Sequence, residues 1–179
     1  MADVKKIATR DSYGNTLKEL AAEGHDDLVV LDADLAAATK TGMFQKAYPD
    51  RHFDCGIAEG NMVGVAAGLA TMGYVLCFQL CHVCSRPRLR AGCRNSVGYP
   101  HLNVKIGAPT VASPWVRTRF PPVLRGLCLM RSIPGMTVIC PADDIEARAA
   151  VRAAYAWKAP STCASAVWLC RCSTMRPTT

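Results

Sequence analysis

The chain has 179 residues, half of them hydrophobic, and a formal net charge of +7. This length favours a single domain, and the hydrophobic fraction is sufficient to bury a core. No apolar run approaches the roughly 18 residues of a membrane-spanning helix, and the first ten residues lack the apolar segment of a signal peptide. We therefore expect a soluble, cytoplasmic protein without a membrane partner.

Short helices and strands alternate from the start of the chain. Asp11 is expected to cap a helix over residues 11–23. The apolar run at 27–32 predicts a buried strand. A loop of small residues over 33–41 then precedes a predicted helix over 42–47.

The alternation continues in the rest of the chain. Residues 53–57, 102–106 and 136–140 predict strands, and residues 61–72 and 143–157 predict helices. This order predicts an α/β fold with a mainly parallel sheet flanked by helices. Ligands of such sheets bind at the carboxyl ends of the strands.

Glu59 is the first candidate functional residue, because it lies between the predicted strand 53–57 and the predicted helix 61–72. A structural role is open to it, since carboxylates are favoured at helix N-termini. A functional role is also open, because a carboxylate in an apolar neighbourhood resists ionising unless a partner compensates it. Its place just beyond a strand end favours function.

Charge and cysteine are unevenly distributed. No acid occurs between Glu59 and Asp143, whereas that interval carries nine basic residues. A basic nucleic-acid face would explain this asymmetry. The spacing Cys77-x3-Cys81-His82-x-Cys84 loosely resembles a metal site, but no paired C-x2-C knuckles occur. We predict neither a metal ligand set nor a disulfide framework.

Residues 54–62, DCGIAEGNM, resemble the transketolase family. The resemblance is to the pyrimidine-binding domain in the C-terminal half of the enzyme, and is strongest to the type that is split into two chains. It also covers five further segments, which are 8–21, 29–35, 43–50, 95–107 and 129–158.

The resemblance implies roles for two residues. Glu59 matches the family's catalytic glutamate, which hydrogen-bonds N1′ of the thiamine diphosphate aminopyrimidine. Asp34 matches the aspartate of the family's A-D-L loop near the thiazolium, so both residues are expected to bind the cofactor. The implied reaction transfers a two-carbon ketol unit between sugar phosphates, in the pentose phosphate pathway.

The resemblance also implies a partner. The family's G-D-G motif for diphosphate and Mg²⁺ is absent from this sequence, so an N-terminal transketolase subunit is expected to supply it within a homo- or heterodimer. We predict no nucleic-acid partner. The alternatives are a deoxyxylulose-phosphate synthase, a 2-oxo-acid dehydrogenase β-type chain, a non-catalytic remnant and a basic binding module.

Three stretches, at about 76–93, 108–128 and 159–179, break the pattern. They hold eight of the ten cysteines and show neither helical nor strand periodicity. Prolines interrupt the second of them, where they disfavour helix and central strand. We accordingly expect a pyrimidine-binding domain over 1–158, aberrant at 76–93 and 108–128, and an aberrant tail over 159–179.

The genetic code offers a reason for these stretches. With permitted codons, residues 78–93 read one base later give FSSAMFAAGRAFEQV, which is typical of the family. Shifted readings of 115–128 permit VGED and ASHQCCEDFA, and a shifted reading of 159–175 permits PVYLRLGRLAVPVFHD. Our hypothesis is that the three stretches are read out of frame, through sequencing error or pseudogene decay. We expect the printed chain to fold poorly and to be impaired. The frame-restored chain carries these shifted readings, and its other residues keep their printed numbers.

Overall fold

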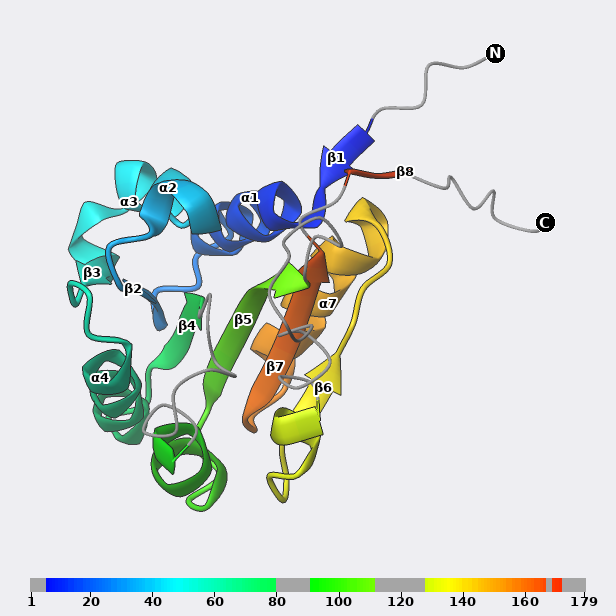
Figure 1. Cartoon of the computed structure of the whole chain (residues 1–179). Coiled ribbons are helices and arrows are strands. Elements are labelled where there is room, and N and C mark those ends of the chain that lie inside the picture. Colours follow the sequence, from blue (N-terminus) through cyan, green and yellow to red (C-terminus); the bar gives the residue numbers. More distant parts are fainter. Residues whose placement is uncertain (1–5, 80–90, 112–127, 167–168, 172–179) are drawn as a thin grey trace, which may run out of the picture.

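A parallel sheet forms the centre of the protein (Figure 1). This computed structural model describes residues 6–79, 91–111, 128–166 and 169–171. Within them, six parallel strands lie in the order β3-β2-β4-β5-β7-β6, and β1 and β8 form a separate antiparallel pair. The predicted α/β fold is therefore confirmed. The strands are β1 (Lys6–Ala8), β2 (Leu28–Asp32), β3 (His52–Asp54), β4 (Val75–Gln79), β5 (Val104–Val111), β6 (Thr137–Ile139), β7 (Ser161–Ala166) and β8 (Leu169–Arg171).

Helices cover both faces of this sheet. One face packs against α1, α3 and α7, and the other packs against α4 and the π-helical turn η2. Two short elements, α2 and η1, flank α3 in the chain. None of the described helices combines the length and apolar character that crossing a bilayer requires. The helices are α1 (Thr9–Ala22), α2 (Ala36–Thr39), α3 (Gly42–Ala47), η1 (Pro49–Arg51), α4 (Glu59–Thr71), η2 (Cys93–Gly98) and α7 (Asp144–Ala156).

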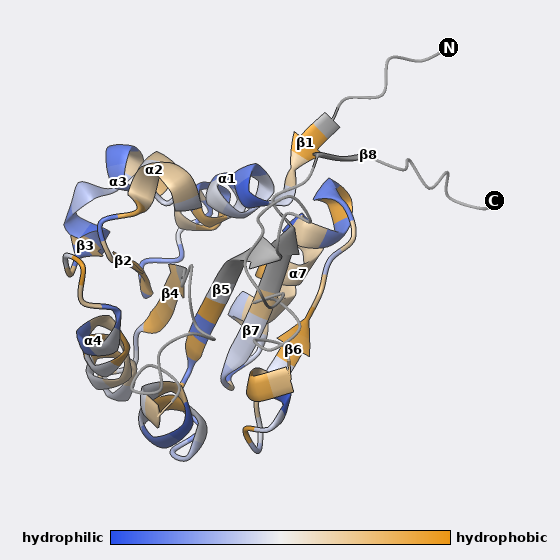
Figure 2. Ribbon diagram, in the orientation of Figure 1, coloured by the Kyte–Doolittle hydropathy of each residue, from blue (hydrophilic) through white to orange (hydrophobic). Residues whose placement is uncertain are grey.

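Strand β2 shows why the sheet is buried on both sides. Leu28 and Val30 join the core beneath α1, whereas Val29 and Leu31 join the core beneath α4. An uninterrupted apolar run is what a parallel strand between two helical layers requires. Figure 2 shows the same hydrophobic colouring along β4, beside β2.

Most predicted helices form close to their predicted bounds. Helix α3 begins and ends where predicted, and α7 differs by one residue at each end. Helix α4 begins at Glu59, so this residue opens the helix instead of preceding it. The prediction that Asp11 caps α1 is wrong, because α1 begins at Thr9 and Asp11 lies in its first turn.

Strand β7 forms in a stretch without strand periodicity. It lies between β5 and β6, and Thr162 pairs with Ile106 and Val138. Its buried residues include Ser161 and Thr162 where a central parallel strand is normally apolar, and Figure 2 shows this part of β7 pale. Ser161 Oγ has no hydrogen-bond partner in the described part of the chain. Such a buried polar group costs about 1–3 kcal/mol.

Lys105 is a buried cation on β5 that binds backbone oxygens directly after the C-terminus of α7. Its Nζ donates to the backbone oxygen of Ala159 at 2.6 Å and also to that of Trp157. Burial, against a weaker opposing effect of Cys77, lowers the pKa of Lys105 to about 8. Deprotonation of Lys105 removes this buried charge and therefore stabilises the folded state relative to the unfolded chain.

We expect the contribution of Lys105 to the free energy of unfolding, taken as the difference between the parent and Lys105→Met, to rise by up to about 3 kcal/mol as the pH increases from 8 to 10.5. In that window the folded chain has lost the Lys105 proton, whereas the unfolded chain still binds it. Denaturant unfolding of the frame-restored chain at several pH values measures this rise. Lys105→Met should remove it, while Lys18→Met, on an exposed position of α1, should leave it intact. An identical rise in Lys105→Met would contradict this assignment.

Candidate active site at the carboxyl edge of the sheet

The loops that follow β2 and β3 leave the sheet at the same edge. The two strands are parallel and pair Asp32 with Asp54, so both end level with each other. Asp34 lies in the first loop, and Glu59 lies at the end of the second. The structure thus brings the two predicted site residues to neighbouring loops at the edge where ligands of parallel sheets bind.

Glu59 is the first residue of α4 and is half-buried. Ala58 occupies the N-cap position and has no side chain that could cap the helix. An acid in this first turn is favoured by the unpaired backbone N–H groups of the helix. The sequence indicated a buried carboxylate, but Glu59 keeps part of its surface exposed.

Asp34 is exposed and has a left-handed backbone, with φ of 58°. Aspartate is one of the few residues other than glycine that tolerate this conformation. The Asp34 N–H donates to Asp54 Oδ1 at 2.9 Å. This hydrogen bond joins the loop after β2 to the end of β3.

Asp32 fixes the loop from the inside, a role that the sequence reasoning missed. Its fully buried carboxylate accepts the Leu35 N–H at 2.6 Å, the Thr39 hydroxyl at 3.0 Å and the Thr41 hydroxyl at 2.5 Å. The signal was an aspartate at the end of an apolar strand, followed by two nearby threonines. Thr39 therefore stabilises the loop, because its hydroxyl donates to the Asp32 carboxylate.

The segment that leads to Glu59 is largely exposed in the described part of the chain. A Cβ added at Gly56 or at Gly60 would meet no atom of the described chain within 4 Å, and both glycines are exposed. Ile57 is 76% exposed in this segment, and Phe53, on β3, is 48% exposed. These exposed side chains lie in the same stretch of chain as the half-buried Glu59 carboxyl group.

Most of the residues behind the metal and nucleic-acid alternatives lie outside the described ranges. Over the described ranges, no three His, Cys, Asp or Glu side chains are grouped to hold a metal ion. Cys77 is buried on β4, whereas Cys81, His82 and Cys84 lie outside the described residues. Six of the nine basic residues of the acid-free interval also lie outside them, namely Arg86, Arg88, Arg90, Arg117, Arg119 and Arg125.

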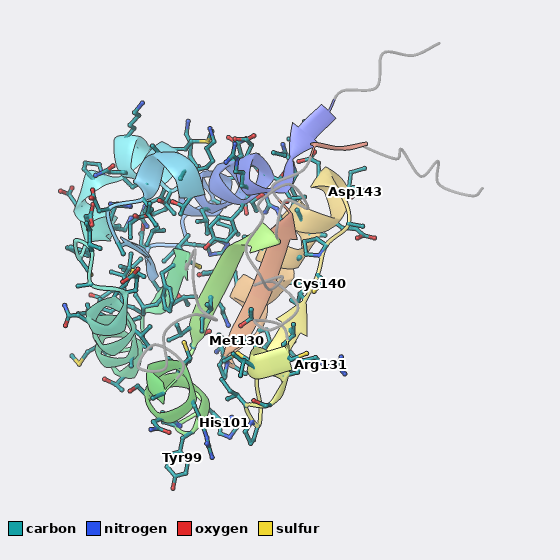
Figure 3. All side chains as sticks on the ribbon, viewed as in Figure 1. Tyr99, His101, Met130, Arg131, Cys140 and Asp143 are labelled. Carbon is teal, nitrogen blue, oxygen red and sulfur yellow. The ribbon has the colours of Figure 1, made fainter. Side chains whose placement is uncertain are left out.

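The two ends of the sheet differ in character. Asp143 follows β6 at the carboxyl edge, and its side chain caps α7 by accepting the Glu146 N–H at 2.8 Å. Tyr99 and His101 precede β5 and lie at the opposite end of the molecule (Figure 3). Asp34 follows β2 and Glu59 follows β3, so both belong to the carboxyl edge of the sheet.

The fold is an α/β domain whose loop carboxylates lie at the edge where ligands of parallel sheets bind. The family model of the transketolase pyrimidine-binding domain matches residues 5–166, and the chain belongs to this family. The predicted family is thus confirmed. The match includes β7 and spans the stretches at 76–93 and 108–128.

Curated relatives and a solved structure agree with the family. A putative transketolase C-terminal section from Methanocaldococcus jannaschii is 40% identical, over 84% of this chain and 48% of that protein. The 6-deoxy-6-sulfo-D-fructose transketolase subunit SqwH from Clostridium sp. is 39% identical, over 79% of this chain and 44% of that protein. A split gene transketolase, solved as an inactive β4 tetramer, has a TM-score of 0.77 and 39% identity, over 92% of this chain and 53% of that chain.

The chain spans about half the length of these curated relatives. All three are transketolases by name, and nothing in them favours the synthase or dehydrogenase alternatives.

Proposed function

We propose that this chain is the pyrimidine-binding subunit of a cytoplasmic, thiamine-diphosphate-dependent transketolase that moves a two-carbon ketol unit between sugar phosphates. The observation that carries the proposal is the place of Glu59, at the first residue of α4 and at the carboxyl edge beside the Asp34 loop. The family membership supplies the cofactor class.

Glu59 is the proposed catalytic residue. Thiamine diphosphate supplies the carbon–carbon chemistry when it is bound. The Glu59 carboxyl group would hydrogen-bond N1′ of the aminopyrimidine and hold or release the proton there. Asp34 would lie toward the thiazolium end, and the half-burial of Glu59 would limit the access of water to the shared proton.

A second subunit is part of the proposal. The sequence has no G-D-G motif, so an N-terminal transketolase subunit would hold the diphosphate and Mg²⁺. The outer side of α4 supports further assembly, because Gly60, Gly64 and Gly68 are exposed beside Val65 and Met72. The relative solved as a β4 tetramer agrees with self-association. The subunits would form a homodimer or a dimer of heterodimers.

A titration with thiamine diphosphate tests the proposed function. The frame-restored chain is mixed with Mg²⁺ and a split-type transketolase N-terminal subunit, and binding is followed by calorimetry. We expect saturable binding only when both subunits are present. If the mixture binds no more cofactor than the N-terminal subunit alone, the chain is a non-catalytic remnant and the proposal fails.

Gly64→Ala tests whether another subunit packs on the exposed side of α4, because it should affect the isolated chain and the assembly in opposite directions. Nothing lies within 4 Å of a Cβ added at Gly64, so alanine should stabilise the isolated chain by about 1 kcal/mol through helix propensity. If another subunit packs on this face, the same methyl group should weaken assembly, as measured by sedimentation. Lys18→Ala, at an exposed position of α1, should leave assembly unchanged. Unchanged assembly in Gly64→Ala would place the interface elsewhere.

A further inference from the structure

Asp54 links the two loops of the candidate site. It is the last residue of β3, and its Oδ1 accepts the N–H of Asp34 and the N–H of Gly56, each at 2.9 Å. One donor belongs to the loop after β2 and the other to the loop that leads to Glu59. We propose that Asp54 is a positioning residue that sets the relative geometry of Asp34 and Glu59.

The first side of this link determines where Asp34 lies. Two consecutive backbone N–H groups, of Asp34 and Leu35, donate to two different carboxylates, Asp54 and the buried Asp32. The Cys55 N–H also donates to the Asp32 backbone oxygen at 2.9 Å. The loop after β2 is therefore held on the outside by Asp54 and on the inside by Asp32.

The second hydrogen bond of Asp54, to Gly56, begins a series of hydrogen bonds that continues to the start of α4 at Glu59. The Asp54–Gly56 hydrogen bond is an Asx-turn, which reverses the chain directly after β3. The Ala58 N–H then donates to the Gly56 oxygen at 2.7 Å, and the Ala58 oxygen accepts the Met62 N–H at 2.9 Å. Each step fixes the next, so the direction in which α4 presents Glu59 depends on this turn.

Backbone conformation adds a reason for the carboxylate. Both donors have left-handed backbones, with φ of 58° at Asp34 and 67° at Gly56. Left-handed conformations are unfavourable for residues other than glycine unless hydrogen bonds support them. One carboxylate oxygen holds both, and charge-assisted hydrogen bonds of this kind are stronger than neutral ones. The consequence for the cofactor rests on the proposed function.

Amide exchange measures the link without the cofactor. NMR spectra are recorded for the full printed chain and, in parallel, for the frame-restored chain, which is identical over residues 6–77. Asp54→Ala should speed hydrogen exchange at the Asp34 and Gly56 amides at least tenfold. Asp54→Asn keeps an acceptor oxygen and should change exchange less than threefold. Asp50→Ala, at an exposed acid of η1, is the charge-matched control and should change neither amide. Unchanged exchange at both amides in Asp54→Ala would overturn the link.

Cofactor affinity then tests the positioning role. In the frame-restored chain with Mg²⁺ and the N-terminal subunit, Asp54→Ala should weaken thiamine diphosphate binding at least tenfold, whereas Asp54→Asn should retain it within threefold. Equal affinity of the parent and Asp54→Ala would overturn the positioning role and leave the proposed function standing. If the parent itself fails to bind, the proposed function fails, and amide exchange alone decides whether Asp54 joins the loops.

Discussion

The frame-restored chain is expected to bind thiamine diphosphate at least about 100-fold more tightly than the printed chain, with the N-terminal subunit present in both cases. We propose that the printed stretches at 78–93, 115–128 and 159–175 are out of frame, so that restoration returns family sequence to the domain. A difference of about 100-fold corresponds to roughly 3 kcal/mol, which several repaired segments can supply.

Strand β7 gives this expectation a structural basis. The Ser161 hydroxyl is buried without a partner in the described residues, and Thr162 is 1% exposed in the middle of the sheet. The shifted reading places the sequence Val-Tyr-Leu over this part of β7, which gains apolar burial in a central strand. We therefore expect the frame-restored chain to unfold at a higher denaturant concentration than the printed chain. Its free energy of unfolding should be greater by several kcal/mol in total.

A chain whose restored residues are shuffled within each segment is the control, and it should behave like the printed chain. A printed chain that melts cooperatively and binds the cofactor as tightly as the restored chain would refute the frame hypothesis. Coding DNA in which the shifted frames cannot be read would refute it as well.

Glu59→Ala in the frame-restored chain should lower kcat/KM by about 10³-fold, because positioned general acid–base groups contribute roughly 10²–10⁴. Glu59→Gln keeps the size of the side chain but cannot hold a shared proton, and it should lose most of kcat. Cofactor affinity should fall far less than turnover in both variants, since the proton matters during reaction. Steady-state kinetics with a ketose phosphate and an aldose phosphate measure the loss of turnover, and titration with thiamine diphosphate measures the loss of cofactor affinity.

Glu23→Gln is the matched control, because this exposed acid of the α1 C-cap pairs with Arg152 far from the carboxyl edge. It should keep full turnover. If the turnover of Glu59→Ala stays within threefold of that of the parent, Glu59 has no catalytic role. Loss of the fold in that variant, seen by circular dichroism, would leave Glu59→Gln to decide the role.

Local sequence was sufficient to predict some elements and not others. Helix α7 could be predicted because Asp143, Glu146 and an alanine-rich repeat signal a capped helix within one segment. Strand β7 could not, because STCASA has no apolar run and depends on backbone pairing with β5 and β6. The strand 53–57 was predicted too long, since the Asx-turn at Gly56 ends β3 at Asp54.

The candidate site was predictable in its residues but not in its geometry. Glu59 could be found because a strand, an acid and a small-residue helix follow one another in the sequence. The link between Asp54 and Asp34 could not, because it depends on the parallel register between β2 and β3. Residues that are distant in sequence share hydrogen bonds only once that register is set.

Exchange of the C2 proton of thiamine diphosphate with deuterium tests most directly whether Glu59 of this chain serves the cofactor. The frame-restored chain and the N-terminal subunit are loaded with cofactor, and the exchange is followed by quenched-flow NMR. We predict that the complex speeds exchange at least 100-fold over free cofactor, and that Glu59→Ala loses this acceleration while still binding the cofactor. Equal acceleration in the parent and in Glu59→Ala would contradict the account.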